Sequence, residues 1–380
     1  MKGFDYRKKH RKLKQDISNI RISFLKLRSL IRKRVSKKID LKDKPQLKVL
    51  ILRTGDEIGD AVILTGLAKK LHDAGYQVNF LGGKSCENLF SHTDFVYKVF
   101  LYDRDRSPRR LKREGFDLVI DLNDILTFRR INLIYKINAN ITIGFNKSRY
   151  PMYSDSIEFM DKDIHITERY KKVLDLLEID SSNYEYSLGI SEEDERIICD
   201  KLSSKRFNYL IALNPLTSSL DKNLSKRQVE EITLFIRKNY QNIGIILIGK
   251  YEKIAEFQTD GCIIFPESTI SFAAAMVKNA DLIITPDTSI VHLSRTFNKK
   301  MIALYNNGRI EETGFFAYNM WLPDYENATV IRVNTPNICE FSSKEIIDKI
   351  KDIIPSELLK SSEQPQAVAN LTQEDTLSVA

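Results

Sequence analysis

Residues 281–292 read DLIITPDTSIVH, an apolar run that passes through a Pro-Asp-Thr-Ser turn into a helical pattern. Such a turn can form an anion site, because the first N–H groups of a helix lack partners and the helix start carries a partial positive charge. Thr288 and Ser289 add hydroxyl groups at this point. The turn therefore predicts a site for a phosphate group.

A second turn of this kind lies near the start of the chain, where residues 49–60 read VLILRTGDEIGD. Its glycines, Gly55 and Gly59, allow the backbone to approach a ligand closely. The two turns fall in different halves of the 380-residue chain. This predicts two nucleotide-binding-type halves that face one cleft, each contributing one turn.

From residue 46 onward, short β-branched runs alternate with helical segments, which is typical of a parallel sheet with crossover helices. A polar stretch at 181–194 separates two such series. The sequence thus predicts two doubly wound domains, at 46–185 and 186–355, with ligands at the carboxyl ends of the strands. The predicted strands are 47–53, 77–81, 96–101, 118–122 and 141–144, then 209–214, 244–249, 262–265, 282–285 and 301–305. Residues 356–380 form a tail whose end, rich in Ser, Gln, Ala and Thr, is expected to be disordered.

The positive charge of the chain is concentrated at its start. Residues 1–48 hold 18 Lys and Arg against four Asp and Glu, a net charge of +14, whereas the remainder carries a net charge of −6. In this segment, apolar residues three or four positions apart place one stripe on a helix, formed by Leu13, Ile17, Ile20, Phe24, Leu27, Ile31 and Val35. The sequence predicts a basic amphipathic helical arm over residues 1–45.

Three partners fit this arm. An anionic membrane surface would meet the Lys and Arg side chains while the stripe enters the lipid interface. The stripe could instead pack on the body of the protein or on a second copy, and a nucleic acid is a third partner. The acidic body gives no support for a nucleic-acid groove, so the membrane surface is the preferred interpretation and no nucleic acid is expected.

Cysteine usage and hydropathy bear on location. The four cysteines form no C-x-x-C pair, which fits a reducing cytoplasm. No run approaches the roughly 18 apolar residues of a spanning helix, and the amino terminus lacks the apolar core of a secretory signal. The expectation is a cytoplasmic protein, peripheral on the inner face of the cytoplasmic membrane.

Asp60 is the candidate catalytic group. It stands at the start of a predicted helix at the mouth of the cleft. A carboxylate within reach of an alcohol can take the alcohol's proton as the oxygen attacks. The alternative is that Asp60 only complements the helix dipole, a common use of Asp in a first turn.

Two further residues are candidates for holding a phosphate. Lys222 follows a buried-type strand and can meet a phosphate as a point charge, although a solvent-facing lysine fits the same polar loop. His292 lies one helical turn after Thr288 and can face the same anion, or can be an ordinary surface histidine. No metal site is expected, because the histidines show no paired spacing and arginines surround the Asp103-Arg104-Asp105 motif.

These motifs resemble the lipopolysaccharide heptosyltransferases, glycosyltransferase family nine. The resemblance rests on residues 53–60, on Lys222 and on residues 287–293, and it covers roughly residues 46–350 in order and spacing. It implies a GT-B fold of two facing Rossmann-like domains, with the acceptor on the first and the nucleotide sugar, usually ADP-heptose, on the second. It also implies that no metal or other cofactor is needed.

By the same resemblance, Asp60 is the general base and Lys222 a ligand of the donor diphosphate. Asp287, Thr288, Ser289 and His292 complete the donor site. The chain departs from the family pattern at two positions: Ser289 replaces a glycine, and Ser271 stands where a glutamate on the donor ribose is expected. Ser271 is therefore only a possible neighbour of the ribose, and the identity of the nucleotide is left open.

The predicted function is inverting, metal-independent transfer of a sugar, expected to be heptose from ADP-heptose, to a lipid-anchored saccharide in lipopolysaccharide or surface-glycan biosynthesis. Two other functions remain open. A GT-B-like nucleotide-sugar epimerase would form product from the donor alone. A non-catalytic, membrane-associated binding protein would gain no stability from a donor.

Overall fold

The computed structural model describes residues 2–31, 46–105, 107–123, 127–159, 164–203, 207–308 and 317–360. Residues 32–45 of the predicted arm and residues 361–380 of the predicted tail lie outside the described residues. Residues 356–360, which the sequence assigned to the tail, belong to the second domain, where Tyr240 and Leu359 form a β-bridge.

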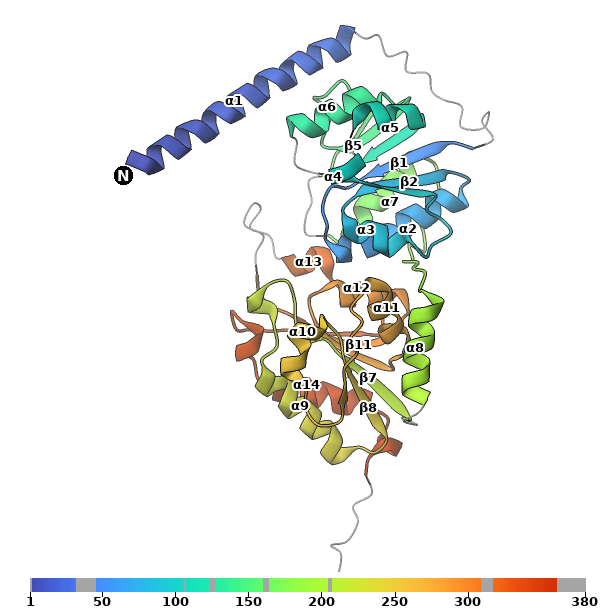
Figure 1. The fold of residues 1–380 in the computed structure, drawn as a ribbon, viewed down its shortest axis with the longest axis vertical. Coiled ribbons are helices and arrows are strands. Elements are labelled where there is room, and N and C mark those ends of the chain that lie inside the picture. Colours follow the sequence, from blue (N-terminus) through green and yellow to red (C-terminus); the bar gives the residue numbers. More distant parts are fainter. Residues whose placement is uncertain are drawn as a thin grey trace, which may run out of the picture.

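Two six-stranded parallel sheets form two domains stacked along the long axis of the molecule (Figure 1). The first sheet has the order β3-β2-β1-β4-β5-β6, and the second has the order β12-β11-β10-β7-β8-β9. Both are the same doubly wound topology, in which the strand order reverses at β1–β4 and at β7–β10. Ligands of such sheets bind outside the carboxyl ends of the strands at this reversal.

The first sheet consists of β1 (Lys48–Leu52), β2 (Gln77–Gly82), β3 (Lys98–Leu101), β4 (Leu118–Asp121), β5 (Ile141–Phe145) and β6 (Asp155–Ile157). The second sheet consists of β7 (Tyr209–Leu213), β8 (Ile243–Leu247), β9 (Cys262–Ile263), β10 (Leu282–Pro286), β11 (Lys300–Tyr305) and β12 (Ala328–Arg332). Every strand predicted from the sequence is present. β6 and β12, one edge strand of each sheet, were not predicted.

The α-helices before the second sheet are α1 (Lys2–Ile31), α2 (Ile58–Asp73), α3 (Lys84–Phe90), α4 (Tyr102–Asp105), α5 (Pro108–Glu114), α6 (Phe128–Ile137), α7 (Thr167–Leu176) and α8 (Glu192–Ser203). The later ones are α9 (Lys226–Asn239), α10 (Tyr251–Ile254), α11 (Ile270–Asn279), α12 (Ser289–Thr296), α13 (Ala317–Trp321) and α14 (Ser343–Ile353). Short 3₁₀ turns are η2 (Leu220–Lys222), η3 (Ala255–Phe257), η4 (Ile338–Glu340) and η5 (Ser356–Leu358).

The central strands carry the apolar runs that predicted them. Four of the five residues of β1 and all five of β10 are buried, as expected for parallel strands covered by helices on both faces. One cluster of buried apolar side chains includes residues from both sheets and from α2, α7, α11 and α12. The two domains therefore share an apolar contact, made chiefly where α2 packs on α12.

α1 lies outside the first sheet, where it packs against α6 (Figure 1). None of the helices in the described part of the chain is both long and apolar enough to cross a membrane.

Candidate active site

The first turn fixes Asp60 at the mouth of α2. The residue lies in the first helical turn, and only 9% of its surface is exposed. Its carboxylate pairs with the guanidinium of Arg53, the residue that directly follows β1, and the same guanidinium reaches Glu57 at 3.2 Å. Arg53 thus holds the Asp60 carboxylate in one position at the end of the central strand.

A buried polar network fastens this turn to the neighbouring strand. The backbone N–H and the hydroxyl of Thr54 both donate to the Asn123 amide oxygen, at 3.0 and 2.9 Å. The Asn123 side chain in turn donates to the Leu52 carbonyl at 3.0 Å, and Arg130 donates to the Thr54 hydroxyl at 2.5 Å. Because the groups of this network are hydrogen-bonded to one another, they limit the movement of the loop that precedes Asp60.

The second turn combines a helix start with a positive side chain. Thr288 is the N-cap of α12, and its hydroxyl accepts the Ile290 N–H at 3.2 Å. The ammonium group of Lys222, at the end of η2, lies 2.7 Å from the carboxylate of Asp287. Lys222, Asp287 and Thr288 therefore come together beyond the carboxyl end of β10, and their binding of a phosphate stays a prediction.

Asn214 connects this turn to the end of β7. Its side-chain amide hydrogen-bonds with the hydroxyls of Thr285 and Thr288, at 2.9 and 3.1 Å. The strand order reverses between β7 and β10. The Asn214 amide therefore supports the second turn at the position where doubly wound sheets bind ligands.

The two turns face each other across the domain boundary. A Cβ atom at Gly59, in the first turn of α2, would lie 3.6 Å from the Ser289 Cα and 3.0 Å from the His292 Cδ2. The starts of α2 and α12 thus meet at a distance that a glycine permits. This contact brings the turn that carries Asp60 next to the turn that carries Thr288 and Ser289.

His292 does not lie as its spacing suggested. The ring is buried between α12 and α2, close to Gly59, and it makes an edge contact with Tyr186 at a centroid distance of 6.3 Å. Burial, together with the nearby charges of His165 and Arg295, lowers the pKa of His292 to about 3. The imidazole is therefore neutral at pH 7 and faces the first domain, so its contact with a phosphate stays a prediction that requires the ring to move.

Ser271 and Gly55 are the remaining predicted residues, and Ser271 is occupied by a contact within the chain. Ser271, in the first turn of α11, accepts the Ser191 N–H at 2.9 Å and so holds the segment that joins the domains. A Cβ atom at Gly55 would meet the flexible carboxylate of Glu57 rather than backbone. A role for Ser271 at the donor ribose, or for Gly55 at a ligand, stays a prediction.

The Asp103-Arg104-Asp105 motif forms ion pairs, as the surrounding arginines suggested. Asp105 is buried, and its carboxylate pairs with Arg104 at 3.3 Å and with Arg110 at 2.5 Å. The same carboxylate accepts the Leu101 N–H at 2.9 Å. The motif therefore fastens α4 and α5 to the end of β3.

Sequence reasoning missed the residues that support the site, chiefly Arg53, Asn123 and Asn214. Arg53 and Asn214 directly follow a strand, and Asn123 stands two residues beyond the end of β4, so all three lie at the carboxyl edge of a sheet. That position was the available signal, because polar side chains at this edge lie beside the ligand site.

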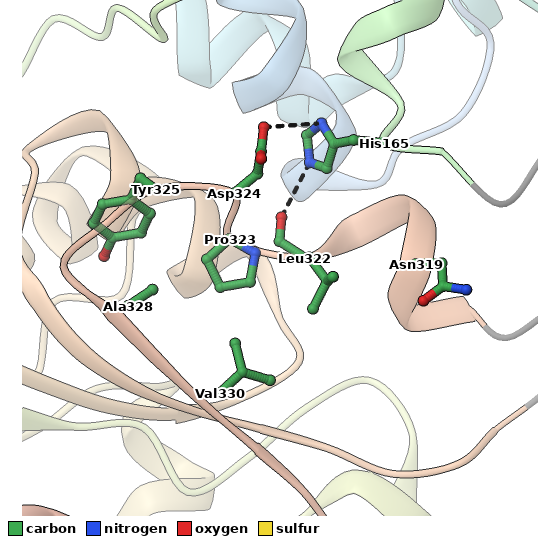
Figure 2. Close-up of a pocket in the computed structure, with 8 residues that line it drawn as sticks. All are labelled: His165, Asn319, Leu322, Pro323, Asp324, Tyr325, Ala328 and Val330. Carbon is green, nitrogen blue, oxygen red and sulfur yellow. Dashed lines mark hydrogen bonds and ion pairs between the residues drawn. The ribbon is translucent and has the colours of Figure 1, made fainter.

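A second contact between the domains surrounds a cavity of about 290 Å³ (Figure 2). His165, from the first domain, hydrogen-bonds through Nε2 with the Leu322 carbonyl at 3.0 Å, and its Nδ1 lies 3.9 Å from the Asp324 carboxylate. The next residue, Ile166, donates its N–H to the Met320 carbonyl at 3.1 Å. The eight residues that line the cavity include none of the predicted site residues.

Two facing doubly wound domains, with a carboxylate on one turn and a helix start beside a lysine on the other, form a fold of the GT-B class. The family model described as glycosyltransferase family 9 (heptosyltransferase) matches residues 104–351. The chain belongs to this family, and it is a glycosyltransferase.

Individual relatives are distant in sequence but similar along most of their length. A putative lipopolysaccharide heptosyltransferase 4 of Escherichia coli is 21% identical over 356 residues, which cover 90% of this chain and 96% of the relative. The structure of E. coli ADP-heptose lipopolysaccharide heptosyltransferase II is 16% identical, with a TM-score of 0.63, and covers 81% of this chain and 98% of its own. E. coli heptosyltransferase WaaC with ADP-2-deoxy-2-fluoro heptose is 15% identical, with a TM-score of 0.62, covering 80% and 99%.

Proposed function

We propose that this glycosyltransferase is inverting and metal-independent and transfers heptose from ADP-heptose to a lipid-anchored saccharide of lipopolysaccharide. The observation that carries the proposal is the contact of the two turns, in which Gly59 brings the start of α2 against Ser289 at the start of α12. The carboxylate lies on one side of this contact and the proposed anion site on the other. The carboxylate can therefore act on the acceptor hydroxyl while the anion site binds the leaving diphosphate of the same sugar transfer.

Asp60 is the base in this proposal. It takes the proton of an acceptor hydroxyl while the oxygen forms a bond to the anomeric carbon of the donor sugar. The bond between that carbon and the diphosphate breaks on the opposite face, and the nucleoside diphosphate leaves with the electron pair. Arg53 contributes by holding the carboxylate in one orientation.

The second turn stabilises the leaving diphosphate. Its donors are the N–H groups at the start of α12, aided by the helix dipole, and the ammonium group of Lys222. Asp287 cannot bind phosphate as a carboxylate, so its place in the donor site is to orient Lys222 and to accept a hydrogen bond from a sugar hydroxyl. This set of donors takes the position that a divalent ion holds in other transferases, so we expect turnover to be unchanged by EDTA.

The nature of the donor and acceptor is supported by the relatives. One solved structure of the family holds a fluorinated ADP-heptose, and the curated relatives are named as lipopolysaccharide heptosyltransferases. A lipid-anchored acceptor would place the reaction at the inner face of the cytoplasmic membrane. The protein would then act as a cytoplasmic, peripheral membrane enzyme.

A thermal-shift panel of ADP-, UDP-, GDP- and CMP-sugars tests the proposal. A ligand that binds only the folded state stabilises it by about 2.7 kcal/mol at one hundred times its dissociation constant. We expect ADP-heptose, and to a lesser extent ADP, to raise the melting temperature. A shift with another nucleotide alone would remove ADP-heptose as the donor, and no shift with any nucleotide would contradict the transferase site itself.

A further inference from the structure

α1 has two different faces, and the structure shows which of them the protein itself covers. Leu25 is only 6% exposed and Ser29 is also buried, while Ile22 is half-buried against α6. These positions repeat at steps of three and four and so form one face of the helix. This inner face attaches α1 to the first domain.

Ring contacts strengthen the attachment. The guanidinium of Arg21 lies 5.6 Å from the centre of the Phe128 ring, at the start of α6. The ammonium group of Lys26 lies 4.1 Å from the centre of the Tyr150 ring. Cations at these distances are attracted by aromatic rings, so two basic residues of α1 also bind the acceptor domain.

The predicted apolar stripe is on the other side of α1. Its described members are exposed: Ile17 by 41%, Ile20 by 69%, Phe24 by 54% and Leu27 by 54%. The stripe therefore does not pack on the body of the protein, which was one of its possible partners. Four large apolar side chains on one exposed helix face are unusual for a soluble surface and indicate a partner.

We infer that this outer stripe, Ile17, Ile20, Phe24 and Leu27, inserts into an anionic lipid surface while the inner face keeps α1 attached to the acceptor domain. The net charge of this segment favours an anionic bilayer over a second copy of the chain. Residues 1–48 carry a net charge of +14, so pairing two stripes face to face would bring two strongly positive segments together. An anionic bilayer compensates the same charge and accepts the apolar side chains.

The attachment of α1 to α6 fixes how the lipid-facing stripe is oriented relative to the first domain. Phe128, which Arg21 contacts, begins the helix whose Arg130 donates to Thr54 in the turn before Asp60. The lipid-facing stripe is thus connected through one short helix to the wall of the proposed acceptor site. This inference rests on the proposed function for its purpose, which is to present the acceptor domain to an acceptor in the same membrane.

Vesicle sedimentation of the full chain tests the lipid contact. With vesicles of phosphatidylethanolamine and phosphatidylglycerol, we expect Ile20→Gln/Phe24→Gln to lower the partition coefficient by about tenfold or more, since a buried Phe or Ile contributes that much to transfer. The matched control, Asn19→Gln/Ser23→Gln, changes two exposed polar residues of the same helix and should bind as the parent does. Binding that is unchanged in the stripe variant overturns the inference. So does a concentration-dependent dimer that the stripe variant abolishes in the absence of vesicles.

A second measurement tests the orientation. Tryptophan placed on the outer face by Phe24→Trp should be quenched by brominated lipid, whereas tryptophan on the inner face by Ile22→Trp should not. The single native tryptophan, Trp321, lies in α13 of the second domain and gives the background. Equal quenching at both positions would show that α1 leaves α6, and would contradict the proposed orientation.

Both experiments are accompanied by a thermal shift with ADP. An ADP shift that is retained in a variant that has lost vesicle binding assigns the loss to the lipid contact alone. A parent protein that binds vesicles but shows no ADP shift would leave the lipid contact intact and contradict the proposed function.

Discussion

The two strand-to-helix turns of this enzyme use the same backbone device in opposite ways. At the start of α2, the protein supplies its own carboxylate, Asp60, which complements the helix dipole. At the start of α12, the N-cap is Thr288, whose hydroxyl accepts the Ile290 N–H. The first turn therefore carries a negative side chain, and the second has a helix start with a partial positive charge. The fold supplies a helix start in each domain, and the side chain placed there, Asp60 or Thr288, decides which charge the turn carries.

The two turns also differ in what supports them. The first is held by Arg53 on the carboxylate and by the Thr54–Asn123 hydrogen bonds beside it. The second is held by the hydrogen bonds of Asn214 with Thr285 and Thr288 and by the ion pair of Lys222 with Asp287, which is partly accessible. This difference suits the proposed mechanism, in which Asp60 acts as the base on a bound alcohol and Lys222 exchanges Asp287 for the departing diphosphate.

The largest effect is expected at the first turn. Asp60→Asn keeps the shape of the side chain but removes the base, and general-base catalysis typically contributes about 10²- to 10⁴-fold. We expect kcat to fall by that factor while the thermal shift with ADP-heptose is retained. Turnover is measured by release of ADP.

Glu57→Gln is the matched control for Asp60→Asn. Glu57 contacts the same Arg53 guanidinium at 3.2 Å, but its side chain is 66% exposed. The control should keep turnover within about threefold of the parent, because exposed ion pairs contribute little. If both variants were equally impaired, the loss would reflect Arg53 and its pairing, and the base would have to be sought elsewhere.

The second turn should show a smaller effect of a different kind. Lys222→Ala removes a charged hydrogen-bond donor of the kind that contributes about 1.5–3 kcal/mol, so we expect the dissociation constant for ADP to rise by about 10- to 100-fold. Lys226→Ala is the control, since Lys226 follows in the same segment but is 61% exposed and pairs only loosely with Glu230 at 3.9 Å. Calorimetric titration with ADP measures both. An unchanged affinity in Lys222→Ala would contradict the assignment of the anion site.

Both turns could be predicted from the sequence because each directly follows a strong local pattern, the apolar run of a central strand. The strands that enter them, β1 and β10, are continuous apolar runs, and the turn residues that follow are polar. The edge strands β6 and β12 were missed for the opposite reason. β6 has three residues and no fully buried position, and β12 has one, so neither carries the apolar run of a central strand.

The side-chain pairings could not be read from the sequence. Helical spacing placed His292 near Thr288, but only the packing of α12 on α2 decides that the ring turns toward the first domain. The periodicity of α1 likewise predicted an apolar stripe, yet the face that packs on α6 is the other one, with Leu25 and Ser29. Contacts between segments distant in sequence decided both cases.

The contact of the two helix starts can be tested at Gly59. Gly59→Ala would place a Cβ 3.0 Å from the His292 ring. Crowding of this kind costs about 1–3 kcal/mol, which exceeds the gain of about 0.5–1 kcal/mol from replacing glycine in a helix. We expect a net loss of about 1 kcal/mol in the free energy of unfolding, measured by denaturant titration.

The same substitution in a His292→Ala background sharpens this test. Without the ring, the Ser289 Cα is still near, at an ordinary contact distance of 3.6 Å. Gly59→Ala should then stabilise the protein, so the sign of its effect reverses. A loss of equal size in both backgrounds would show that the helix starts do not meet through His292.

The smallest expected effect concerns pH and again separates the two regions. Burial lowers the pKa of His292 to about 3, and burial also lowers the pKa of His165 at the other domain contact. As the pH falls, these two histidines are protonated in the unfolded chain near pH 6.5 but stay neutral in the folded protein. Their contribution to the free energy of unfolding is therefore complete above pH 6.5 and is lost as the pH drops toward their pKa values in the folded protein. Between pH 6.5 and 5.5, His292 alone should cost about 1 kcal/mol in the free energy of unfolding.

His292→Gln should remove its share of this slope, while His72→Gln, at an exposed position in α2, should leave the slope unchanged. Denaturant titrations at several pH values measure the slope for each variant. We assign the residual slope in His292→Gln to His165, whose Nε2 hydrogen-bonds with the Leu322 carbonyl at 3.0 Å. A slope that His292→Gln leaves unaltered would mean that the ring is solvated in solution, and hence that α2 and α12 spend much of their time apart.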